Sequence, residues 1–138
     1  MFITLTKRGL AAVLLCAILG LSFGVWGLSQ KGTVIDGSTH QKRMAYLHRI
    51  GYYPEENGQQ KEVTLPKTFG AVYTRYNQIQ KQGGFDLKPF RGQKATVFTY
   101  ALNEKQDIHL ITVKGTLVGG DIADRSVEGE MRPLGSLK

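Results

Sequence analysis

The pattern of apolar and polar residues divides the chain into a continuous apolar segment near the N-terminus and a longer region of mixed composition. Residues 9–29 contain no charged side chain. At about 1.5 Å per residue, an α-helix over this segment would be about 30 Å long, which matches the hydrocarbon core of a bilayer. In lipid the backbone has to satisfy its own hydrogen bonds, so a helix is the expected conformation. The pattern predicts a transmembrane helix or signal anchor at residues 9–29, in contact with membrane lipid.

The charges on either side of this segment predict its orientation. Lys7 and Arg8 directly precede it, whereas Lys31 follows as a single charge. Because basic flanking residues tend to remain in the cytoplasm, we expect residues 1–8 to be cytoplasmic and the C-terminal region to be extracytoplasmic. The expected location is therefore the cell membrane, with a single span.

Three other interpretations of the apolar segment remain open. A cleaved signal peptide is suggested by small residues at Ser22 and Gly24 and at Gly27 and Ser29, but the apolar run is longer than the roughly 7–15 residues typical of such a peptide. A lipoprotein would carry its lipid on Cys16, although a leucine stands where a small residue is expected before it. A buried helix of a soluble protein is disfavoured by uniform apolarity. Cleavage and lipidation would both leave the domain outside.

The region after the apolar segment begins with a polar stretch and a first helix. Residues 30–38 are mostly polar, include two glycines, and are expected to form a flexible stalk. Helical spacing of apolar residues then predicts a helix over residues 39–50, with Ser38 as its N-cap and Gly51 just past its end. The folded domain is therefore expected to comprise residues 39–138, including a polar C-terminal tail after residue 124.

A second helix is predicted over residues 66–82. Proline is favoured in the first turn of a helix, which suits Pro66, and the Gly83-Gly84 pair is expected to end the helix. One apolar face is predicted from residues at helical spacing, namely Phe69, Val72, Tyr73, Tyr76 and Ile79.

Strands are predicted on both sides of the second helix. Alternating and β-branched residues indicate strands, and Lys114-Gly115 indicates a tight hairpin between the last two. The order of a helix, a short strand, a helix and three meandering strands predicts an α+β domain, with two helices on one face of an antiparallel sheet of three to four strands. The predicted strands are residues 62–65, 94–102, 108–113 and 116–122.

Composition limits the domain count and the class of partner. The chain has 138 residues, of which 41% are hydrophobic, so the part beyond the apolar segment suffices for one folded domain. The formal net charge is +7, but the basic residues are scattered and form no basic tail. A mildly basic domain is attracted to anionic lipid or anionic wall polymers, unless its charges simply form a mixed, solvated surface. The single cysteine excludes an intramolecular disulfide.

Several short motifs occur in the same order as in a known family. The sequence resembles the family of bacterial membrane-anchored or secreted proteins called domain of unknown function 4830, over about residues 41–134. This resemblance supports the topology and the fold class, and it implies no activity. The motifs are Val63-Thr64-Leu65-Pro66, Tyr76-Asn77, Gly83-Gly84-Phe85-Asp86-Leu87, Phe90-Arg91-Gly92-Gln93, Thr99-Tyr100 and Val118-Gly119-Gly120-Asp121-Ile122.

The histidines form no recognisable metal motif. His40 and His48 are eight residues apart on one predicted helix, which separates them by about 12 Å along its axis. His109 stands alone on a predicted strand, and neither CxxC nor HExxH occurs. We therefore expect no metal site and no cofactor.

Two short segments supply candidate ligand-binding residues. Gly119, Gly120 and Asp121 would allow a ligand to approach the backbone closely, or they mark a bulge or tight crossing in a strand. Asp86 and Arg91 flank a constrained loop, where they would form a recognition site or pair with each other. In both cases the structural interpretation is the simpler one.

These features favour a non-enzymatic binding or interaction module of the cell envelope. Its expected partners are membrane lipid and either an envelope protein or an anionic wall polymer, whereas nucleic acid is not expected outside the cytoplasm. One alternative is a secreted soluble factor released by cleavage. Another is a small extracytoplasmic hydrolase that uses Asp86, His109 and Asp121.

Overall fold

A computed structural model of the chain describes residues 4–5, 7–8, 34–126 and 129–135. The chain divides into two units, Met1–Val34 and Ile35–Lys138. In the first unit, the described residues form β1 (Thr4–Leu5) and β2 (Lys7–Arg8), which pair in parallel. The predicted membrane segment lies outside the described residues. Among the residues that are described, no helix has the length and apolarity needed to cross a membrane.

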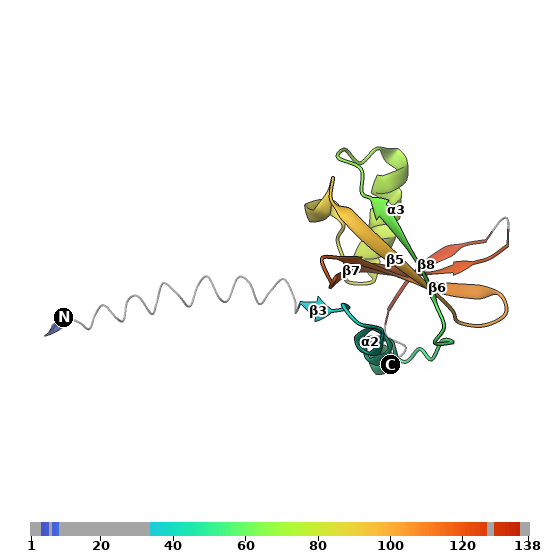
Figure 1. Cartoon of the computed structure of the whole chain (residues 1–138). Coiled ribbons are helices and arrows are strands. Elements are labelled where there is room, and N and C mark those ends of the chain that lie inside the picture. The colour runs from blue at the N-terminus through green and yellow to red at the C-terminus, as the bar shows by residue number, and fades with distance from the viewer. Residues whose placement is uncertain (1–3, 6, 9–33, 127–128, 136–138) are drawn as a thin grey trace. The chain divides into compact units, whose positions relative to one another are not determined.

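The second unit is built on one antiparallel sheet of six strands (Figure 1). The strand order is β3-β7-β6-β5-β4, and β8 also pairs with β7. The α+β class is thus confirmed. In chain order, the elements are β3 (Ile35–Asp36), α2 (His40–Ile50), β4 (Gln59–Thr64), α3 (Ala71–Gln82), the 3₁₀ helix η1 (Lys88–Phe90), β5 (Lys94–Ala101), β6 (Gln106–Val113), β7 (Thr116–Asp124) and β8 (Met131–Pro133).

The sheet has more strands than the predicted three to four, because two short strands lie in segments that were expected to be irregular. Strand β3 falls in the predicted stalk, and β8 falls in the predicted polar tail. Both pair with β7 along the edge that β6 leaves open. Strands of two or three residues have too few side chains to show a periodic pattern, so their pairing depends on the exposed edge of β7.

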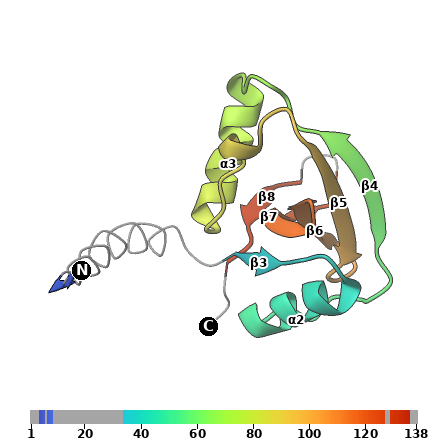
Figure 2. The same ribbon diagram turned by 60° about the vertical axis from the view of Figure 1, so that its left-hand side comes forward.

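The two helices lie on opposite faces of the sheet, and the prediction that they share one face is wrong. Side chains alternate between the faces along a strand, so Ile108 and Leu110 of β6 point to one face and Ile111 and Val113 to the other. The first pair packs in a core cluster with Leu47 of α2. The second pair packs with residues that flank or belong to α3, including Leu65, Leu87 and Tyr73. Because both faces of β6 are apolar, each needs its own cover. Figures 1 and 2 show α2 and α3 on opposite sides of the sheet.

Helix α2 begins and ends within one residue of the predicted range, 39–50. Its N-cap is Thr39, whose hydroxyl accepts a hydrogen bond from the Lys42 N–H at 3.2 Å, so the predicted cap at Ser38 is off by one residue. Gly51 follows the helix in the left-handed conformation, with φ of 105°, as predicted. The predicted hairpin is also present, with positive φ at Lys114 and Gly115.

Helix α3 begins five residues later than predicted, and its predicted apolar face is confirmed in part, because Phe69, Tyr73 and Tyr76 pack against the core. Residues 65–66 pair with the chain near Gly92 instead of starting a helix, because the Leu65 N–H donates to the Gln93 carbonyl and the Gly92 N–H donates to the Leu65 carbonyl, both at 2.9 Å. Val72, expected on the apolar face, is 79% exposed.

Candidate functional site

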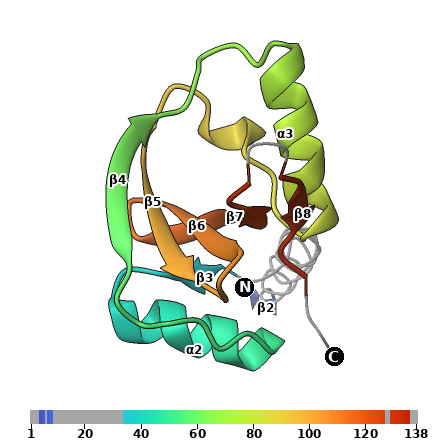
Figure 3. The same ribbon diagram turned by 90° about the vertical axis from the view of Figure 1, so that its right-hand side faces the viewer.

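Helix α3 places polar side chains against the sheet. Asn77 and Gln80 are buried, and Tyr76 is half-buried. The helix runs alongside β7 and β8 (Figure 3), so these side chains reach the second half of β7. There Tyr76 and Gln80 meet His109 and Asp121, and we call these four residues the buried polar cluster.

Asp121 is the centre of the buried polar cluster and is fully buried. Its Oδ1 lies 2.8 Å from Nδ1 of His109, its register partner on β6. Its Oδ2 accepts a hydrogen bond from the Tyr76 hydroxyl at 3.0 Å, and Nε2 of Gln80 lies 3.4 Å from the same oxygen. A buried carboxylate has to be hydrogen bonded and is stabilised further by opposite charge. This cluster supplies the hydrogen bonds, and a protonated His109 supplies the charge.

The position of Asp121 shifts the pKa values of two neighbours. The hydrogen bond to Asp121 raises the pKa of His109 above its usual 6.5, an effect that burial of the imidazole opposes. Burial raises the pKa of Tyr76 far above its usual range, and the charge of Asp121 adds to the shift. The imidazolium is thus favoured at His109, and Tyr76 stays a neutral donor.

Of the three residues in the hydrolase hypothesis, the fold brings His109 and Asp121 into contact. An imidazole held by a buried carboxylate is the arrangement that orients general bases in hydrolases. The side chain of His109 is 27% exposed, so one edge of the ring reaches solvent. The third residue of that hypothesis, Asp86, makes its contacts with Asn77 and Lys88 instead. The three side chains therefore do not form one hydrogen-bonded group.

The two candidate glycines allow close packing between β7 and its neighbours. A Cβ at Gly119 would lie 2.9 Å from Oε1 of Gln80, and a Cβ at Gly120 would lie 2.7 Å from Cδ2 of Leu134. The Gly120 N–H donates to Oε1 of Gln80 at 2.7 Å. A register shift between β6 and β7 occurs beside these glycines. These contacts fit the structural interpretation of the motif, and ligand binding by Gly119, Gly120 and Asp121 stays a prediction.

Asp86 stabilises the loop after α3 without pairing with Arg91 in the described contacts. Its Oδ1 accepts hydrogen bonds from Asn77 Nδ2 at 2.8 Å and from the Lys88 N–H at 2.9 Å. The side-chain oxygen of Asn77 accepts the Leu87 N–H at 2.7 Å. Partial burial acts to raise the pKa of Asp86, but these hydrogen bonds and the nearby lysines outweigh it, so the pKa is lowered. The predicted structural role of Asp86 thus involves partners other than Arg91.

Arg91 instead lines an open groove of about 390 Å³ beside α3 and η1, which we call the basic groove. No carboxylate lines it among the described residues, and no ion pair is recorded there for its cationic side chains. Asp86 lies near two of the lining cations, Lys81 and Lys88, but the depression carries a net positive charge, which makes it a favourable site for an anion. The lining cations are Lys67, Lys81, Lys88 and Arg91, and the uncharged lining residues are Thr68, Phe69, Thr74, Asn77 and Gln78.

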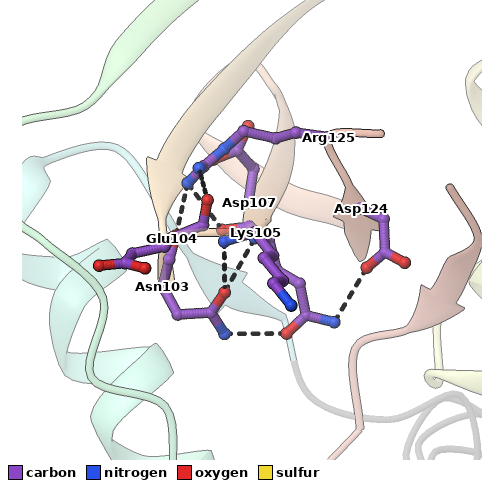
Figure 4. Close-up of polar contacts among 7 residues, drawn as sticks. Asn103, Glu104, Lys105, Asp107, Asp124 and Arg125 are labelled. Carbon is purple, nitrogen blue, oxygen red and sulfur yellow. Dashed lines mark hydrogen bonds and ion pairs between the residues drawn. The ribbon is translucent and has the colours of Figure 1, made fainter. Parts of the chain in front are cut away.

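Arg125, in contrast to Arg91, uses its guanidinium for hydrogen bonds within the protein (Figure 4). Its Nε donates to Oδ1 of Asp107 at 2.8 Å. Its terminal nitrogens donate to the carbonyls of Glu104 at 2.5 Å, Asn103 at 2.6 Å and Gln106 at 3.1 Å. These bonds tie the end of β7 to the turn between β5 and β6. The guanidinium is thus engaged within the protein.

The three histidines lie in separate surroundings. His40 approaches Glu56 at 3.5 Å, His48 stacks on Tyr53 with ring centroids 4.7 Å apart, and His109 contacts Asp121. Over the described ranges, no three His, Cys, Asp or Glu side chains are close enough together to hold a metal ion.

Sequence reasoning missed Gln80 and the basic groove for different reasons. Gln80 lies one helical turn after Tyr76 and so on the same face of the helix. A polar residue on that sheet-facing side could have been predicted to make a buried polar contact. The groove had no such signal, because its four cations come from three places in the chain, namely Lys67, Lys81 and the pair Lys88 and Arg91, and form no charge run.

Comparison with known proteins identifies a family. The model of one family matches residues 46–122, which is more than half of the chain. The matched range includes the buried polar cluster and the basic groove. No curated protein and no solved structure matches the chain. The chain belongs to the family described as Domain of unknown function (DUF4830), as its motifs predicted.

Proposed function

We propose that this protein is a membrane-anchored, extracytoplasmic binding module whose basic groove holds a phosphate-rich anionic polymer of the cell envelope. The observation that carries the proposal is the set of four cations around one groove that no described carboxylate lines. An ordinary solvated surface mixes charges of both signs. A concentration of one sign at a depression instead favours a ligand of the opposite sign.

The groove suits a chain of phosphates better than one phosphate. Each exposed cation contributes about 0.5–1 kcal/mol to an ion pair at ordinary salt, which is too little for one contact to hold a ligand. Several contacts to one polymer add together, because each later contact is intramolecular. The hydroxyls of Thr68 and Thr74 offer further donors, and Phe69 offers an apolar surface to the carbon backbone between phosphates.

The expected location supports this choice of ligand. The apolar segment at residues 9–29, preceded by Lys7 and Arg8, favours an anchor with the domain outside. Anionic wall polymers are found in that compartment, whereas nucleic acid is not expected there. The argument also holds for a secreted factor, because cleavage of the segment would leave the domain on the same side.

The proposal is tested by titrating the purified full chain, in a neutral detergent, with poly(glycerol phosphate). The variant K67Q/K81Q removes two groove cations, and the matched control K61Q/K105Q removes two exposed cations elsewhere. At about 0.5–1 kcal/mol per cation, the groove variant is expected to bind roughly 5- to 30-fold more weakly, while the control changes binding less than about 2-fold.

Two results would contradict the proposal. Equal loss of affinity in both variants would mean that net charge, and not the groove, attracts the polymer. Binding that does not weaken between low and high salt would exclude an electrostatic groove, since exposed charges are screened within about 10 Å at 0.1 M salt.

A further inference from the structure

Arg43 of α2 is a buried cation without an acidic partner in the described part of the chain. The residue is only 8% exposed. Its Nε donates to the Tyr100 hydroxyl and a terminal nitrogen donates to the Gly37 carbonyl, both at 2.8 Å. The centre of the guanidinium lies 3.6 Å from the centroid of the Phe98 ring. All of these partners are neutral, and no described Asp or Glu lies within 4.0 Å of this guanidinium.

This arrangement leaves a positive charge uncompensated inside the domain. Burying an ion costs several kcal/mol unless opposite charge is nearby, and buried arginines are therefore almost always paired. A stacked aromatic ring and two neutral acceptors offset part of that cost. A guanidinium has five N–H groups, of which the recorded contacts to Tyr100 and Gly37 use two. The charge and the remaining donors are available to an anion that can reach them.

A pocket gives access to this guanidinium. It has a volume of about 290 Å³ and is lined by Arg43, His40, Phe98 and Tyr100 and by residues 56–60. Gly58, just before β4, packs closely against Tyr100: a Cβ added at Gly58 would lie 2.5 Å from the ring of Tyr100. The pocket is therefore small, with aromatic walls and a buried cation in its lining. Pockets of this size are at the lower limit for small-molecule ligands.

We propose that this pocket binds a carboxylate group, held by the guanidinium of Arg43 and delivered by a small organic acid or by the C-terminus of a peptide. The planar fork of a guanidinium matches a carboxylate in size and geometry. His40, which also lines the pocket, adds a second positive charge when it is protonated. The one acidic lining residue is Glu56, which lies 3.5 Å from His40 and reduces the attraction for an anion.

The test compares two ligands that differ only in charge. Acetyl-alanyl-alanine and its C-terminal amide are titrated into the ¹⁵N-labelled full chain, with acetate as a third probe. The acid is expected to shift backbone signals around the pocket and to bind at least 10-fold more tightly than the amide. Acetate that binds as tightly as the peptide acid identifies a small acid as the source, and tighter binding of the peptide identifies a chain terminus. Equal shifts from acid and amide, or no shifts at the pocket, would overturn the proposal.

Two variants separate recognition from a structural role for Arg43. R43K keeps the charge but removes the fork, and it is expected to lose at least 10-fold in affinity for the acid. E56Q leaves every recorded contact of Arg43 in place and is expected to bind the acid several-fold more tightly. Unchanged or weaker binding in E56Q contradicts a carboxylate site, and this result stands even if R43K does not fold.

Discussion

Removing His109 is expected to destabilise the domain through the charge that it leaves behind. His109 is hydrogen bonded to Asp121, which is 0% exposed, and its protonated form is the cationic partner of that carboxylate. Breaking a buried ion pair by removing one partner costs about 3–5 kcal/mol. The side chain of His109 is 27% exposed, and Asp121 keeps its contacts with Tyr76 and Gln80. The expected loss for H109A is therefore below that range, at about 2–3 kcal/mol.

The variant D121N provides the comparison, because it removes the charge and keeps the shape. Its amide oxygen can still accept at one of the two oxygen positions, but its nitrogen cannot accept at the other, so the expected cost is about 1–2 kcal/mol. The double variant H109A/D121N has no buried charge left at this position. Its loss is expected to be smaller than the sum of the single losses by about 1–2 kcal/mol.

Urea unfolding of the full chain, followed by the near-ultraviolet circular dichroism of its tyrosines, measures these losses. The pKa of His109 is raised in the folded protein, so its charge stabilises the fold fully below about pH 6.5, the unfolded value. That contribution is lost as the pH rises through the folded pKa. The stability difference between the wild type and H109A should therefore narrow at alkaline pH. A loss below about 0.5 kcal/mol, or a difference that is constant from about pH 5 to 10, would refute the buried ion pair.

The remaining predictions concern packing and topology. G120A places a Cβ 2.7 Å from Leu134 and is expected to cost about 1–3 kcal/mol in urea unfolding, whereas G135A, where no atom lies within 4 Å of the added Cβ, should change stability little. Equal effects of the two substitutions would contradict the packing argument. A reporter active only in the cytosol, fused after Lys138, should remain inactive in cells, and its activity would place the domain on the cytoplasmic side.

Local signals in the sequence predicted the elements that depend on local chemistry. Gly51 ends α2 and the Lys114-Gly115 turn joins β6 to β7, because both need positive φ at defined positions. The long strands β5, β6 and β7 were found within a few residues, since apolar and β-branched residues recur over eight or nine positions in each. Strand β4 was predicted short because its first residues are polar and exposed at the edge of the sheet.

The candidate site was predicted in pieces. Asp121 and His109 were each named, but only the register of β6 and β7 places them opposite each other. Gln80 joins them because α3 turns the buried polar residues Asn77 and Gln80 toward the sheet, whereas Val72, expected there, is exposed.

The sequence by itself determined the α+β class, the family, the order of the main elements and the turns that join them, because each follows from spacing and residue type within a short window. The tertiary structure decided which face each helix covers, added β3 and β8, and gathered Lys67, Lys81 and Arg91 at one groove. It also buried Arg43 beside a pocket, and among the described residues Arg43 has no acidic partner. These features depend on contacts between residues far apart in the chain, and no local pattern of apolar and polar positions encodes such contacts.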